Sequence, residues 1–420
     1  MNIFHGIDWV LVFLYACLIF IGWLNIYSAT ITENNFDLLN FSTEYGKQLI
    51  WIGLSIPLII LILIFDAKFY EKYASIIYVV SLFLLAGLFI IGKNINGATS
   101  WYDFGGFSLQ PSEFAKAATA LAIAKLVSDK LFNLKKLNTQ LQAFIILFFP
   151  ALLITLQPDP GSALVYTAFI FVLYREGLPI YYITIGFIAA LLFVITLYFG
   201  FLSTLIGSLF VFAVILSYFI FYRKKALKKG WIKIIGIYLA SVLFIFSVDL
   251  VFNHVFEQRH RDRFNILLGK TVDLKNIGYN TNQSVTTIAS GGFTGKGFLE
   301  GERTQGGFVP ENQTDYIFTI VGEEWGFIGS TTVIILFVLF LLRIIQIAER
   351  QKSKFTRVYG HSIAAIFFMH FTINIGMVLG LLPTIGIPLP FFSYGGSALW
   401  GFTVLLFIFI RLDANRSYEW

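Results

Sequence analysis

The feature that most constrains this chain is a series of long apolar segments. Runs of about 17 to 25 apolar residues recur along the sequence, and one helix of that length crosses the hydrocarbon core of a bilayer. Hydrophobic residues make up 57% of the 420 residues and charged residues only 13%, unlike the composition of a soluble protein. The sequence therefore predicts an all-α polytopic membrane protein.

The apolar runs predict about twelve transmembrane helices. One uncharged stretch, 178–222, is too long for a single crossing and is interrupted by Gly200, so we expect two helices there. The other expected spans are 9–28, 49–65, 73–91, 111–127, 141–156, 161–174, 232–252, 316–344, 361–382 and 397–410. We expect residues 1–420 to form a single integral membrane domain.

The basic residues predict the orientation in the membrane, because Lys and Arg accumulate in cytoplasmic loops. If the N-terminus is cytoplasmic and the spans alternate, most of the 30 Lys and Arg residues fall on the inner side, chiefly in 68–72, 125–136, 223–233 and 343–357. Both termini are then cytoplasmic. The net charge of +6 follows from this topology, so the expected surroundings are membrane lipids and no nucleic-acid partner is predicted.

Two polar segments fall on the outer side under this topology. The first is 92–110, and the second is a large extracytoplasmic loop, 253–315, before the tenth predicted helix. Loops of that length are commonly functional, and this loop keeps enough Phe, Ile and Tyr to pack as a folded cap. A single cysteine, Cys17, excludes a disulfide framework, and the five histidines show no metal-ligand spacing.

Asp315 follows Thr314 in the large loop and directly precedes an apolar run, so it lies where a polar loop meets a membrane helix. One interpretation is a helix cap, which stabilises a helix end by about 1 kcal/mol. The other is a general base at the outer membrane surface, which takes a proton from a substrate hydroxyl. In either case the helix dipole would favour the charged carboxylate.

Glu113 and Lys116 form a second candidate, within the segment QPSEFAK at 110–116. Three residues apart, they share a helix face and can pair. Lys116 lies one turn into an apolar helix, where an unpaired ammonium group is costly. The pair is either a structural ion pair or a cation near an anionic substrate, with Glu113 keeping the lysine charged.

Two further acidic positions carry alternative interpretations. Asp159 lies in the turn QPDPG at 157–161, which ordinary turn chemistry explains without a function. Glu323 and Glu324 are consecutive in the helix that follows Asp315, and so they point in different directions. At least one of them should face a polar cavity or a cation.

In their order along the chain, these motifs resemble the SEDS family (shape, elongation, division, sporulation), the RodA and FtsW group. The resemblance covers nearly the whole length. It rests on IYSA at 26–29, QPSE at 110–113 with Lys116, QPD at 157–159 with Gly161, Gln283 with Ser284, SGG at 290–292 with GKG at 295–297, Pro310 with Glu311, Thr314 with Asp315, Glu323 and Glu324 with Gly326, and 386–396. Each motif is weak alone, but their order is specific.

The resemblance implies a peptidoglycan glycosyltransferase that polymerises lipid II at the outer face of the bacterial cytoplasmic membrane, for cell elongation and shape. It also implies a class B penicillin-binding protein transpeptidase as partner. The essential acid of the family's Thr-Asp motif corresponds to Asp315, and the acid and lysine that line the central cavity correspond to Glu113 and Lys116. Asp159, Gln283 and Glu323 are further cavity candidates.

In that reaction the growing strand is the donor, and it leaves from its polyprenyl pyrophosphate. The 4-hydroxyl of the incoming lipid II is the acceptor, for which Asp315 is the expected base. The departing pyrophosphate needs positive charge, either from Lys116, Lys296 and Arg303 or from a divalent cation, Mg or Mn.

The chain departs from the family pattern at some positions. Many relatives have His before the Thr-Asp pair, whereas Gln313 stands here, so an imidazole at this position is not part of the mechanism. The family core has about ten spans, so we expect 178–252 to include an inserted helix pair. A lipid II flippase or transporter, a non-catalytic scaffold, and an FtsW-like division protein remain alternatives.

Overall fold

A computed structural model describes residues 6–31, 40–95, 97–105, 107–222, 224–256, 258–270 and 278–418. The chain divides into two compact units, where the sequence predicted one membrane domain. The first comprises Met1–Pro179 and Thr281–Trp420, and the second comprises Ile180–Asn280. The expected inserted pair lies within the second unit, but its status as an insertion stays a prediction.

Ten helices within the described residues are long and apolar enough to cross a membrane. They correspond to α1 (Trp9–Thr30), α2 (Glu44–Ile64), α3 (Ala67–Ile91), α5 (Leu137–Thr155), α8 (Tyr181–Phe199), α9 (Phe201–Tyr222), α10 (Lys224–Leu250), α15 (Gly326–Glu349), α16 (Lys354–Val378) and α17 (Gly396–Ala414). The two other expected spans are α4 (Pro111–Ser128) and a broken pair, α6 (Pro160–Val165) with α7 (Ala168–Arg175). The multi-pass membrane class is confirmed, and the count of twelve stays a prediction.

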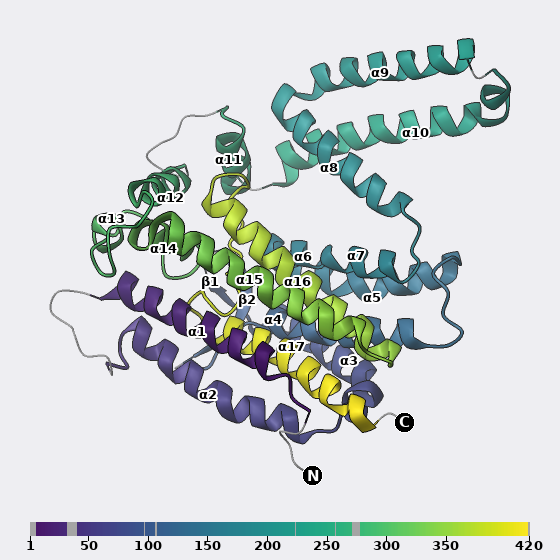
Figure 1. Ribbon diagram of the computed structural model, residues 1–420. Coiled ribbons are helices and arrows are strands. Elements are labelled where there is room, and N and C mark those ends of the chain that lie inside the picture. Colours follow the sequence, from purple (N-terminus) through teal and green to yellow (C-terminus); the bar gives the residue numbers. More distant parts are fainter. Residues whose placement is uncertain are drawn as a thin grey trace. The chain divides into compact units, whose positions relative to one another are not determined.

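Helix α4 forms the centre of the first unit, where it packs against α3, α5, α16 and α17. Its alanines between 115 and 124 are buried, and small side chains of this kind let neighbouring helices approach closely. Helices α15 and α16 run side by side (Figure 1), and α17 packs against α2, α4 and α16. Ser112, Glu113, Lys116 and Thr119 of α4 are therefore enclosed by protein.

The segment 92–110 contains the only strands among the described residues. They are β1 (Lys93–Ile95), β2 (Ala98–Asp103) and β3 (Ser108–Leu109), which form a small antiparallel sheet in the order β1-β2-β3. Lys93 pairs with Asp103 at its exposed edge. The sheet is a local addition to a helical membrane fold.

The large loop is folded, as expected, within its described part. It contains α11 (Gln258–Leu267), α12 (Tyr279–Ser290) and α13 (Glu302–Gln305), and α13 packs against α1 and against α14 (Phe318–Glu324). The predicted span 316–344 is interrupted: α14 ends at Glu324, and α15 begins at Gly326. Gly326 has φ +61°, and a Cβ there would stand 2.2 Å from the backbone nitrogen of Gly295, so loop backbone occupies the break.

The second unit contains α8, α9, α10, a short π-helix η1 (Val251–Val255) and α11. Helices α8, α9 and α10 pack against one another. The predicted break at Gly200 is confirmed, because this residue has φ +85° and separates α8 from α9. The ring of Phe264 in α11 contacts Phe193, Phe252 and Phe256, which joins the start of the large loop to this helical unit.

Candidate active site

The irregular connection 383–395 between α16 and α17 packs closely against distant helices of the first unit. A Cβ on Gly22 of α1 would stand 2.6 Å from the Cα of Phe392, and one on Gly161 of α6 would stand 2.8 Å from the carbonyl oxygen of Ile385. Two glycines from distant helices thus allow this backbone to pass between them. The sequence indicated only a rigid outer connection here.

Asp315 lies in the turn that precedes α14 and faces this connection. Its Oδ2 atom is 3.4 Å from the position that a Cβ on Gly386 would occupy, and its carbonyl oxygen accepts a hydrogen bond of 2.8 Å from Asn374 Nδ2. The helix-cap interpretation is wrong, because α14 begins at Phe318 with Ile317 in the N-cap position. The local backbone turns through 311–317 before it becomes helical, so Asp315 stands outside the helix end.

Glu113 and Lys116 form the predicted ion pair, with Lys116 Nζ 2.8 Å from Glu113 Oε2. Both side chains are buried inside the bundle. Lys116 Nζ is also 2.9 Å from His370 Nε2 and lies over the ring of Phe402, 4.9 Å from its centroid. The ammonium group is therefore surrounded by one carboxylate, one imidazole and one aromatic face.

Asp159 caps α6, and its carboxylate accepts a 3.0 Å hydrogen bond from the Ser162 backbone nitrogen. This confirms the turn interpretation. The same carboxylate also accepts a 3.1 Å hydrogen bond from Gln110 Nε2, directly before α4. Asp159 thereby joins the start of α6 to the start of the helix that carries Glu113.

The other candidates, Gln283, Lys296, Arg303 and Glu323, form a separate cluster at α12, α13 and α14. Glu323 is fully buried and accepts hydrogen bonds from the backbone nitrogens of Arg303 (3.0 Å) and Thr304 (2.8 Å), and from Lys296 Nζ (3.2 Å). Burial alone would raise the pKa of Glu323, but these hydrogen bonds lower it below its ordinary value. The expectation that one of the two glutamates faces a cation is confirmed.

Arg303 continues this cluster toward α12. Its guanidinium donates hydrogen bonds to Gln283 Oε1 and, over 3.0 Å, to Thr287 Oγ1. The same group lies 4.9 Å from the centroid of the Phe308 ring. Lys296 also reaches Glu302, and its hydrogen bonds to Glu323 and Glu302 raise its pKa. The two cations therefore sit in a network of hydrogen bonds on the expected outer side.

Glu324 points away from this cluster and toward α1. It is buried and accepts a hydrogen bond from Ser28 Oγ, in the IYSA motif. Burial outweighs this bond and raises the pKa of Glu324 to about 7. Helix α14 precedes the candidate membrane span, so this carboxyl joins the end of α1 to the end of α14.

The described residues contain no group of three or more His, Cys, Asp or Glu side chains that could hold a metal ion.

Two residues of this site were not predicted from the sequence, His370 and Asn374. Both lie on α16 and are almost fully buried. His370 contacts Lys116 and the Pro388 carbonyl oxygen, and Asn374 contacts the carbonyl oxygens of Asp315 and Ile387. A signal existed, because two polar residues four apart in an apolar helix share a face and need buried partners. What they contact could not be read from that spacing.

Comparison with known proteins places this geometry in a family. The family model described as cell cycle protein, for FtsW, RodA and SpoVE, matches residues 8–205 and 186–418. The peptidoglycan glycosyltransferase RodA of Treponema pallidum is 29% identical, over 97% of this chain and 98% of its own length. The peptidoglycan glycosyltransferase MrdB of Escherichia coli K12 is 30% identical, over 90% of this chain and 86% of its own length.

Solved structures show the same fold. One chain, from a study of how a peptidoglycan synthase complex coordinates polymerization and crosslinking, has a TM-score of 0.70 at 24% identity and covers 98% of this chain and 99% of its own. The rod shape determining protein RodA of Thermus thermophilus has a TM-score of 0.62 at 23% identity, over 98% and 97% of the two chains. The chain belongs to the SEDS family, in the FtsW, RodA and SpoVE group of cell cycle proteins.

Proposed function

We propose that this protein is a peptidoglycan glycosyltransferase that polymerises lipid II into glycan strands for cell elongation and shape. The observation that carries the proposal is the position of Asp315, a loop carboxylate that lies against the backbone of Gly386. The polymerising relatives named above support the same reaction class.

In the proposed reaction, Asp315 accepts the proton of the acceptor 4-hydroxyl as its oxygen attacks the anomeric carbon of the growing strand. The bond from that carbon to the polyprenyl pyrophosphate breaks, and the pyrophosphate leaves with the electron pair. Lys296 and Arg303 are the cations of the outer loop that can approach this charge. Lys116 is fully buried against Glu113, so we assign it a structural part and no contact with the leaving group.

The proposed topology places both termini in the cytoplasm and Asp315 at the outer face of the bacterial cytoplasmic membrane. Asp8, before α1, pairs with Arg343 and Arg350 at the end of α15, and Arg350 also pairs with Asp413 at the end of α17. The two chain ends therefore lie on one face of the first unit.

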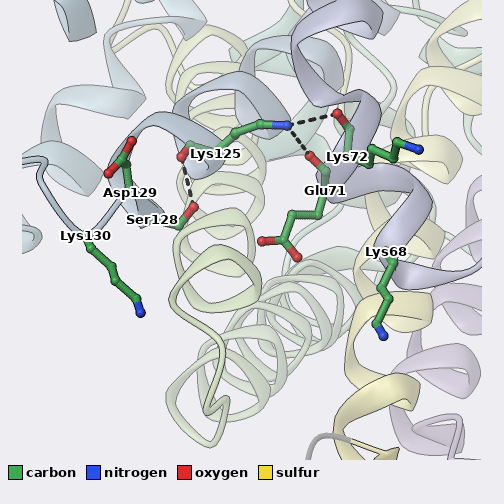
Figure 2. Close-up of a pocket in the computed structure, with 7 residues that line it drawn as sticks. All are labelled: Lys68, Glu71, Lys72, Lys125, Ser128, Asp129 and Lys130. Atoms are coloured by element: carbon green, nitrogen blue, oxygen red, sulfur yellow. Dashed lines mark hydrogen bonds between the residues drawn. The ribbon is translucent and has the colours of Figure 1, made fainter.

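A lysine-rich hollow of about 540 Å³ supports the same orientation. It lies between the start of α3 and the end of α4, and Figure 2 shows it lined by Lys68, Glu71, Lys72, Lys125, Ser128, Asp129 and Lys130. Lys125 donates hydrogen bonds to the carbonyl oxygens of Glu71 (2.8 Å) and Lys72 (2.9 Å). Basic residues at this end of two spans are what the inner side of a membrane requires.

We further propose a class B penicillin-binding protein as the partner that crosslinks the strands. The support is the fold that this chain shares with a component of a complex that couples polymerization and crosslinking. Co-purification of the full chain with such a transpeptidase from detergent-solubilised membranes tests the pairing, and no association at micromolar concentration would contradict it.

The decisive experiment incubates the purified full chain with lipid II, with and without the transpeptidase, and separates the products by size. Wild type should form glycan strands, and Asp315→Asn, which keeps the shape and removes the base, should form none. Asp103→Asn, at an exposed outer acid, is the matched control and should stay active. Equal polymerisation by wild type and Asp315→Asn would refute the proposal. Transfer of lipid II across vesicles by both, without strands, would favour a flippase.

A further inference from the structure

Asn374 joins the Asp315 turn to the 383–395 connection. Its Nδ2 group donates one hydrogen to the carbonyl oxygen of Asp315 and the other to that of Ile387, each over 2.8 Å. Because both acceptors are carbonyls, the side-chain amide can have only one orientation. A single fully buried side chain therefore holds two backbone segments together.

His370 holds the next residue of the same connection. Its Nδ1 lies 3.2 Å from the carbonyl oxygen of Pro388, and its Nε2 lies 2.9 Å from Lys116 Nζ. A carbonyl can only accept and an ammonium can only donate, so Nδ1 carries the hydrogen and Nε2 presents its lone pair. The imidazole thus links the Glu113 and Lys116 ion pair to the 383–395 connection through two hydrogen bonds.

The two residues act at adjacent points. His370 and Asn374 are four residues apart and lie one above the other on one face of α16, while their acceptors, Pro388 and Ile387, are consecutive. Gly386, the preceding residue, has φ +79°, and the Asp315 carboxylate lies against its backbone. A shift of this short segment would move the surface on which Asp315 rests.

The need to pair buried polar groups does not by itself explain why an asparagine stands at position 374. Its Oδ1 is buried and has no hydrogen-bond partner among the described residues. Leaving such an acceptor unpaired costs about 1 to 3 kcal/mol, so an apolar side chain would serve helix packing better. The two donated hydrogen bonds are the compensating feature, and both end on backbone beside Asp315.

We propose that His370 and Asn374 are positioning residues, which hold Asp315 and the 386–388 backbone in the geometry that the transfer reaction needs. This inference rests on the proposed function of Asp315. They touch backbone and Lys116, and they act on the reaction through Asp315. A displacement of about 1 Å in a catalytic group can cost about 100-fold in rate.

The test measures lipid II polymerisation by the full chain with its transpeptidase, separating kcat from KM. Asn374→Ala should lower kcat about 10- to 100-fold, with KM within about threefold because the substrate contacts are kept. His370→Leu should behave similarly, and His370→Asn, which retains a donor for Pro388, should recover part of the loss. Ser362→Ala removes a buried hydroxyl elsewhere on α16, which donates to the Val358 carbonyl oxygen, and is the matched control.

A second measurement is independent of activity. Hydrogen exchange of the intact protein should become faster in peptides that cover 313–317 and 386–389 in Asn374→Ala, and stay unchanged in α15. If wild type polymerises, Asp315→Asn does not, and Asn374→Ala keeps full kcat, the positioning role is refuted. If wild type makes no strands, the proposed function fails. Unchanged hydrogen exchange in those peptides would still refute the positioning role of Asn374.

Discussion

The buried pair of Glu113 and Lys116 should make each single substitution strongly destabilising and the double substitution much less so. Their side chains are 3% and 0% exposed, and the ammonium is 2.8 Å from the carboxylate and 2.9 Å from His370. Removing one partner of a buried ion pair costs about 3 to 5 kcal/mol, because the other charge stays buried without compensation. Glu113→Gln and Lys116→Met should each destabilise the protein by that amount.

The single variants should be less stable than the double variant, because each of them leaves one buried charge without its partner. The double variant removes both charges and should regain much of the loss.

Thermal unfolding of the detergent-solubilised protein at neutral pH measures these effects. Lys125→Gln is the matched control at the other end of α4, where a partly exposed lysine bonds to backbone carbonyls of α3, and it should cost about 1 kcal/mol or less. Losses below about 1 kcal/mol for both single variants, or a double variant that loses the sum of the two single losses, would refute a buried charged pair.

Three further predictions concern α14 and the residues packed around it. Glu324, with its pKa raised by burial to about 7, binds more protons in the folded than in the unfolded protein between about pH 4.5 and 7, so stability falls as pH rises through that window. Glu324→Gln should abolish this decline, and melting curves at pH 5 and 8 would show it. The opposite holds for Glu323, whose lowered pKa stabilises the fold above its unfolded pKa and loses that effect as pH falls. Glu323→Gln should speed hydrogen exchange across 296–305 at pH 7, and unchanged exchange would contradict this. Gly326→Ala forces a Cβ to within 2.2 Å of Gly295 nitrogen and should lower the melting temperature by several degrees, whereas Gly53→Ala, with open space around it, should not.

The helices were predictable because apolar runs and their interruptions are local properties of the sequence. The break at Gly200 was predicted from an uncharged stretch too long for one crossing, and the pairing of Glu113 with Lys116 from a three-residue spacing. The break at Gly326 was missed because the apolar run resumes directly after it, and only the backbone of Gly295, more than thirty residues earlier, shows why the helix stops there.

The sequence alone determined the membrane class, the order of the spans and the motifs that identify the family. Only the tertiary structure decided how the candidate residues meet. Asp315 is not a helix cap, because the chain first turns through 311–317, and the backbone that it faces comes from a connection about seventy residues later. His370 and Asn374 acquire their role from partners on α4, the Asp315 turn and that connection. Hydrophobic periodicity specifies which segments become helices, but contacts between distant segments depend on how the helices pack, which no local pattern encodes.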